Sequence, residues 1–118
     1  MSSEKIENWL KNMAEENTVN NYLFEIESDL KKIQHSTDFS KNLRTHTALG
    51  NKIRYSIFKI LEQKELCTCV LAKLFDIKEG TISHHLKILE QAGLIIGLKK
   101  GLYTVYYTKS NMIDALNA

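Results

Sequence analysis

Proline is absent from this sequence of 118 residues, and glycine occurs only five times, at positions 50, 80, 93, 97 and 101. Both residues interrupt regular secondary structure, so their scarcity favours long helices in the first part of the chain. Because four of the five glycines follow residue 79, turns are expected mainly towards the C-terminus.

Long hydrophobic runs are also absent. No apolar stretch approaches the roughly 20 residues that cross a bilayer, and the first seven residues lack the basic and then apolar order of a signal peptide. We therefore expect a cytoplasmic protein with no membrane partner. In that compartment the only two cysteines, Cys67 and Cys69, would stay reduced and available as thiolate ligands. The cysteine pair and four scattered histidines form no recognisable set of nucleophile, base and orienting group, so no enzymatic role is expected.

Charge is divided unevenly along the chain. Residues 1–50 contain 6 Lys/Arg and 8 Asp/Glu, whereas residues 51–118 contain 10 and 6. With 43% hydrophobic residues the chain can bury one core, most simply that of a single domain, 1–118. The cationic second half favours a nucleic-acid partner there and self-association at the N-terminus, although plain surface solubility explains the charge equally well.

Apolar periodicity predicts two N-terminal helices, at residues 3–16 and 19–36. In the second, apolar residues recur at alternating steps of four and three, the spacing that packs one helix along another: Val19, Leu23, Ile26, Leu30 and Ile33. We expect residues 1–38 to form a helical extension for dimerisation. The alternative is that this stripe packs on the domain's own core.

Two further helices and a hairpin follow. Helical patterns at 66–75 and 80–92, with a short break between them, predict a helix-turn-helix over residues 66–92. After Gly93, β-branched and aromatic residues flank a basic turn that contains glycine, which predicts a β-hairpin over 94–108. The expected fold is therefore mainly α with a small β-hairpin wing: a winged helix-turn-helix with extended N-terminal dimerisation helices.

At these residues the chain resembles the ArsR/SmtB family of winged-helix repressors, over roughly 43–108. Residues 48–54 (Ala-Leu-Gly-Asn-Lys-Ile-Arg) are similar to that family's entry helix, 81–89 (Thr-Ile-Ser-His-His-Leu-Lys-Ile-Leu) to its recognition helix, and 92–95 (Ala-Gly-Leu-Ile) to its exit into the wing. Residues 65–71 (Glu-Leu-Cys-Thr-Cys-Val-Leu) resemble the Glu-Leu-Cys-x-Cys-Asp-Leu box of the arsenic- and antimony-responsive branch. The resemblance implies a homodimeric repressor that leaves its operator DNA when As(III) or Sb(III) binds, with no cofactor required.

The chain departs from the family pattern at several positions. Val70 stands where the box usually has aspartate, and Ala72 where some members have a third cysteine. Residues 111–118 contain no histidine, so they do not match the zinc site that other members build across their C-terminal helices.

Cys67 and Cys69 are the expected metalloid ligands, because soft trivalent ions prefer thiolates. Residues two apart on an ideal helix point about 200° away from each other, so binding is expected to distort the start of the 66–75 helix. The alternatives are two buried small side chains, a reversible disulfide strained by helical geometry, and zinc held with two histidines.

DNA contacts are expected from the recognition helix and the wing. In the helix, Ile82, Leu86 and Leu89 should face the core, which leaves as groove-facing candidates Lys78, Thr81, Ser83, His84, His85 and Lys87. His84 is favoured over His85 as the contact to a base or phosphate. In the wing, phosphate contacts are expected from Lys99, Lys100 and Tyr103, with a solvated hairpin tip as the alternative.

The sequence favours a metalloid-responsive repressor and leaves two other functions open. One is a thiol redox sensor on the same DNA-binding frame. The other is a winged helix that binds a protein partner and has no DNA role.

Overall fold

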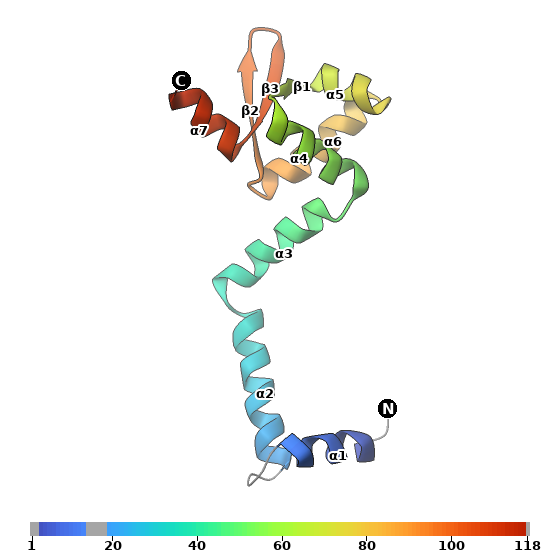
Figure 1. Ribbon diagram of the computed structural model, residues 1–118, viewed down its shortest axis with the longest axis vertical. Coiled ribbons are helices and arrows are strands. Elements are labelled where there is room, and N and C mark those ends of the chain that lie inside the picture. Colours follow the sequence, from blue (N-terminus) through green and yellow to red (C-terminus); the bar gives the residue numbers. More distant parts are fainter. Residues whose placement is uncertain (1–2, 14–18, 118) are drawn as a thin grey trace. The chain divides into compact units, whose positions relative to one another are not determined.

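The computed structural model describes residues 3–13 and 19–117. The chain divides into two compact units, residues 1–40 and 41–118. In the first unit, α1 (Ser3–Met13) contacts α2 (Val19–Gln34), and α3 (Thr37–Leu49) begins there and continues into the second unit (Figure 1). Residues 14–16 of the first expected helix lie outside the described part of the chain.

The apolar stripe of α2 is largely exposed. Leu23 is half-buried, whereas Ile26, Leu30 and Ile33 are 42%, 51% and 57% exposed. Val19 begins α2, and its side chain lies outside the described residues. The helix ends two residues earlier than expected, because the hydroxyl of Ser36 donates to the Ile33 carbonyl oxygen and a turn follows.

The second unit contains the remaining elements. They are α4 (Lys52–Gln63), β1 (Leu66–Cys67), α5 (Thr68–Phe75), α6 (Glu79–Gln91), β2 (Ile95–Lys100), β3 (Tyr103–Thr108) and α7 (Lys109–Asn117). Its core is built from fully buried side chains of α4, α5 and α6: Ile57, Leu61, Leu71, Ile82, Leu86 and Leu89. The expected inward face of the recognition helix is thereby confirmed, as is the mainly helical fold with a small β-hairpin.

The two helices of the helix-turn-helix are closed by similar turns. After α5, Asp76 adopts a left-handed conformation at φ 53°, and the Ile77 amide donates to the Ala72 carbonyl at 3.1 Å. After α6, Gly93 is at φ 76°, and the Leu94 amide donates to the Leu89 carbonyl at 3.1 Å. In each turn an amide beyond the helix bonds to a carbonyl near the helix end, and the residue in the left-handed conformation ends the helix.

The sheet is larger than expected. Its strand order is β1-β3-β2, all antiparallel, with Leu66 opposite Tyr106 and Cys67 opposite Val105. The prediction of a continuous helix over 66–75 is therefore wrong at its start: Leu66 and Cys67 form a short strand, and α5 begins at Thr68. Figure 1 shows β1 lying beside β3 and leading directly into α5.

The wing turn lies later than the basic turn expected at residues 99–101. Lys99 and Lys100 pair with Thr104 and Tyr103 inside the hairpin, so the turn lies at Gly101 and Leu102. Gly101 is at φ 65°, a conformation that glycine adopts without a steric cost.

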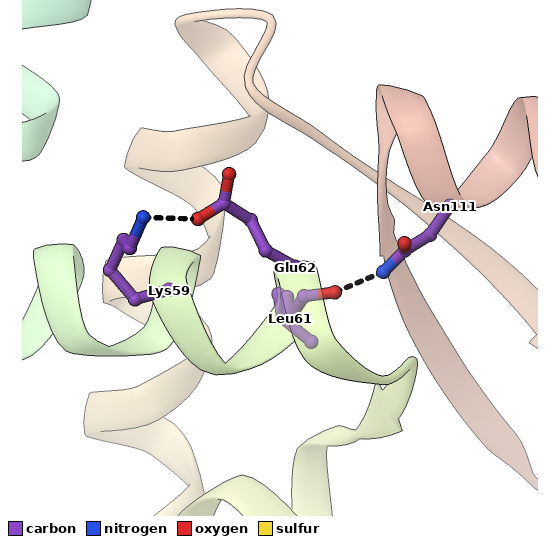
Figure 2. A network of polar contacts seen from close by, with 4 residues as sticks. All are labelled: Lys59, Leu61, Glu62 and Asn111. Atoms are coloured by element: carbon purple, nitrogen blue, oxygen red, sulfur yellow. Dashed lines mark hydrogen bonds and ion pairs between the residues drawn. The ribbon is translucent and has the colours of Figure 1, made fainter.

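The final helix is tied back to the core. Its start is capped by Thr108, whose Oγ1 accepts from the Asn111 amide at 3.3 Å. The Asn111 side-chain amide donates to the Leu61 carbonyl of α4, and on the outer side of α4 Lys59 pairs with Glu62 at 2.7 Å (Figure 2). None of the helices in the described residues is long and apolar enough to cross a membrane.

Candidate functional site

The two thiols lie at the junction between β1 and α5. Cys67 is the last residue of β1, in an extended conformation at φ −85° and ψ 163°, and Cys69 belongs to the first turn of α5. Their sulfur atoms are 2.8 Å apart and share a hydrogen bond. The expected separation of about 200° around one helix axis is wrong, because Cys67 is not helical. Both sulfurs can therefore reach one ion without unwinding α5.

The shared hydrogen bond makes the two thiols unequal. Donation from Cys69 and from backbone amides at the start of α5 lowers the pKa of Cys67 against the opposing effect of burial. The same hydrogen bond and the charge of Cys67 raise the pKa of Cys69. Cys67 is thus the first thiolate to form, at a helix N-terminus that favours negative charge.

The cysteine pair lines an open pocket of about 450 Å³ that also contains wing residues. Apolar side chains of β1, α5 and β3 form much of the wall, and Lys100 and Tyr103 come from the wing. On another side the thiols meet Glu79, at the start of α6, and Leu102 at the tip of the wing. The thiols therefore stand where the first helix of the helix-turn-helix meets the wing.

Within the described part of the chain, the two thiols are not joined by a third side chain in a metal-binding group. Among the described residues, no group of three His, Cys, Asp or Glu side chains is placed to hold a metal ion. Zinc bound by this cysteine pair and two histidines finds no geometric support in that part of the chain.

The recognition helix α6 presents most of the expected polar residues to solvent. Thr81, Ser83, His84 and Lys87 are exposed, and Lys78 is exposed immediately before the helix. His84 and Lys87 are one turn apart, on the face opposite the buried residues. Gly80 lies on the same face, with no atom within 4 Å of the position that a Cβ would occupy. The face is therefore open for close approach.

His85 differs from its neighbours. It is half-buried, and its Nδ1 lies 3.3 Å from the guanidinium of Arg54 in α4. Burial, the charge of Arg54 and the proximity of His84 lower its pKa. Sequence reasoning grouped His85 with the DNA contacts and gave Arg54 no separate role, because no periodic pattern relates two residues 31 positions apart.

The wing lysines also differ from each other. The Lys100 ammonium lies over the Tyr107 ring, 5.3 Å from its centroid, and a hydrogen bond with the Tyr107 hydroxyl raises the pKa of Lys100. Lys99 and Tyr103 are exposed. The three wing candidates do not form one cluster: Lys100 and Tyr103 border the thiol pocket, whereas Lys99 lies on the other face of the hairpin.

Comparison with known proteins places residues 51–96 in a family described as bacterial regulatory protein, arsR family. A putative arsenical resistance operon repressor of Halobacterium salinarum is 41% identical over 64 residues, which are 52% of this chain and 50% of that protein. This chain thus spans half the length of that relative. An uncharacterised helix-turn-helix transcriptional regulator of Methanocaldococcus jannaschii is 34% identical over 79 residues, 66% of this chain and 89% of the relative.

Further matches include a cadmium-resistance regulator and a solved structure. A cadmium resistance transcriptional regulatory protein of Listeria innocua is 32% identical over 54 residues, 46% of this chain and 45% of that protein. Among solved structures, the homodimeric winged helix-turn-helix DNA-binding domain of a possible ArsR-family regulator from Mycobacterium bovis has a TM-score of 0.58 at 25% identity. That match covers 65% of this chain and 71% of the domain, and it confirms the winged helix-turn-helix fold.

Proposed function

Because this chain belongs to the ArsR family of bacterial helix-turn-helix regulators, we propose that it represses transcription by binding operator DNA as a homodimer, and that As(III) or Sb(III) releases it by binding Cys67 and Cys69. The family consists of transcriptional regulators, in agreement with the expectation of a non-enzymatic role.

The observation that carries the inducer assignment is the 2.8 Å separation of the two sulfurs. A soft trivalent ion takes thiolates in preference to oxygen ligands. In neutral water As(III) is arsenous acid, As(OH)3, so each thiol proton leaves with one hydroxyl group as water: two arsenic–oxygen bonds break, two arsenic–sulfur bonds form and two water molecules are released. Each subunit supplies two sulfurs, and we assign the third position on the ion to a solvent oxygen.

An ion held by both sulfurs would bridge β1 and α5 by covalent bonds in place of the shared hydrogen bond. Cys67 belongs to β1, which pairs with the wing, and Cys69 belongs to α5, which packs against α6. We propose that this link fixes the wing and the recognition helix at a relative angle unsuited to DNA. An ion that binds the DNA-free form more tightly than the DNA-bound form lowers the affinity for DNA. By thermodynamic linkage, DNA lowers the affinity for the ion by the same factor.

DNA binding would use the exposed face of α6 and the wing. His84 and Lys87 face outwards at the centre of α6, with Thr81, Ser83 and Lys78 beside them. Lys99 and Tyr103 supply exposed phosphate-binding groups on the hairpin. Lys100 would contribute less, since its ammonium is already engaged by Tyr107.

Dimerisation is assigned to the first unit. The exposed stripe of Ile26, Leu30 and Ile33 has the spacing of a helix-packing seam, and a dimer places two recognition helices on half-sites about 34 Å apart. Covering this stripe with a second copy would remove three large apolar side chains from water.

The test is the binding of a labelled duplex, selected from a random pool by the protein itself, at low salt and with increasing As(III), Sb(III) or Cd(II). We expect As(III) and Sb(III) to release the wild-type protein. Cys67→Ser and Cys69→Ser should bind DNA normally and remain bound. Release of either variant would overturn the two-thiolate trigger, and a protein that binds no duplex even at low salt would favour a protein-interaction role instead.

A second candidate function, thiol redox sensing, gains from the same distance. Sulfurs 2.8 Å apart need a small movement to reach the 2.05 Å of a disulfide. The two thiols would lose two protons and two electrons to a peroxide and form the disulfide, while hydrogen peroxide is reduced to two water molecules or an alkyl peroxide to an alcohol and water. Reversible loss of both free thiols with peroxide, together with DNA release and weak As(III) binding, would favour this function over the first.

A further inference from the structure

Arg54 joins two other helices through one guanidinium group. Its Nε donates to the Ala48 carbonyl at 2.7 Å and another nitrogen to the Thr47 carbonyl at 3.4 Å, both in the last turn of α3. A third nitrogen reaches Nδ1 of His85 in α6 at 3.3 Å. The carbonyls at the end of a helix lack partners within it and attract a cation, so this end of α3 is a favourable place for Arg54.

The backbone at Arg54 is itself held in place. Asn51 caps α4, and its Oδ1 accepts from the amides of Ile53 and Arg54 at 3.0 and 3.1 Å. Arg54 therefore starts from a fixed point and spans from α3 to α6. α3 is also the helix through which the chain passes from the first unit to the second.

We propose that Arg54 and His85 are positioning residues for DNA binding, which hold the recognition helix α6 against the end of α3, and that His85 does not contact DNA. The inference rests on the proposed DNA binding and adds a specific role within it. Two recognition helices must enter grooves at a set spacing, so a small rotation of α6 on its own subunit should affect a specific site more than random DNA.

The contact requires a neutral His85. Arg54 has only donors, so Nδ1 of His85 must accept and the ring proton must be on Nε2. Protonation would remove the acceptor and set two cations 3.3 Å apart. The charged or titratable groups facing His85 are Arg54 from α4 and His84 from its own helix, and both oppose its protonation.

The first experiment compares operator and random duplex for Arg54→Gln, His85→Leu and the double variant. Each single variant should lose about tenfold in operator affinity with little change on random DNA, and the double should lose no more than one of them, as expected for partners in one contact. His85→Gln, which keeps an acceptor, should bind closer to wild type. Lys59→Gln is the matched control, because it removes one positive charge from the outer side of the same helix, where Lys59 pairs with Glu62 (Figure 2).

Three outcomes would overturn the proposal. If Arg54→Gln lowers affinity equally for both duplexes, and the salt dependence of binding falls by the amount expected for one phosphate contact, Arg54 contacts a phosphate. Additive losses in the double variant would show that the two residues act independently. Operator affinities of both single variants within twofold of wild type would leave no positioning role.

A second experiment measures operator affinity as a function of pH. In a His84→Gln background, which removes the exposed histidine next to it, operator affinity should fall as pH drops through the pKa of His85, which lies below the ordinary histidine value of about 6.5. Adding His85→Gln should remove that fall, and its persistence would contradict the proposal. NMR titration of the free protein should find the pKa of His85 below its ordinary value and higher in Arg54→Gln. If Arg54→Gln leaves the pKa of His85 unchanged, the contact between the two residues is contradicted. This titration uses the free protein, so its result does not depend on whether the protein binds DNA.

Discussion

Gly97→Ala tests how tightly β2 of the wing is packed against β3. Gly97 lies in β2 opposite Tyr106, and an added Cβ would sit 2.8 Å from Cε1 of the Tyr106 ring. The ring is half-buried against the core, and Tyr106 lies opposite Leu66 of β1, the residue before Cys67. The ring can therefore move away only by disturbing its packing on the core and beside β1.

The expected cost follows from two opposing effects. Overpacking of this kind costs about 1–3 kcal/mol, and alanine in place of glycine recovers about 0.4–1 kcal/mol by restricting the unfolded chain. The net loss in the free energy of unfolding should be about 1–2 kcal/mol, or roughly 3–10 °C in Tm for a chain of this size.

Urea and thermal unfolding would measure the effect, with Gly80→Ala as the control. That glycine lies in α6 with open space around it, so alanine should stabilise the helix by up to about 1 kcal/mol. In a Tyr106→Leu background the Gly97→Ala penalty should shrink, because the ring is gone. A Gly97→Ala protein as stable as wild type would refute the packing argument.

Three further predictions concern DNA, thiols and assembly. His84→Ala should weaken operator binding by about 1–3 kcal/mol more than random-duplex binding, and Lys99→Ala should weaken both alike and flatten the salt dependence by about one phosphate; equal losses for His84→Ala would make it a phosphate contact. Iodoacetamide should modify Cys67 at a lower pH than Cys69, because the pKa of Cys67 is lowered and that of Cys69 is raised; coincident pH profiles by mass spectrometry would contradict the shared hydrogen bond. Removal of residues 1–38 should shift the protein towards monomer in sedimentation experiments and lower operator affinity, whereas an unchanged dimer would place the seam elsewhere.

Helical periodicity was sufficient to predict which face of α6 packs on the core. The inward positions follow from apolar residues spaced three and four apart, and all of them are fully buried: Ile82, Leu86 and Leu89. Gly93 indicated the end of that helix because its positive φ suits glycine and few other residues.

The geometry of the thiol pair could not be predicted in the same way. A two-residue strand has no period, and β1 exists because Cys67 pairs with Val105, far along the chain. Once Cys67 is extended rather than helical, the two sulfurs meet instead of diverging. The contact between Arg54 and His85 was missed for a similar reason, since it depends on how α4 packs against α6.

The central claim is that one metalloid ion bound by both thiols releases the protein from DNA. The most direct test titrates As(III) into one sample of reduced protein and labelled operator while free thiols and DNA anisotropy are followed together. We predict that one As(III) per subunit removes two thiols and that DNA release follows the same curve. Release that is complete before the thiols are consumed, or loss of both thiols without release, would contradict the account.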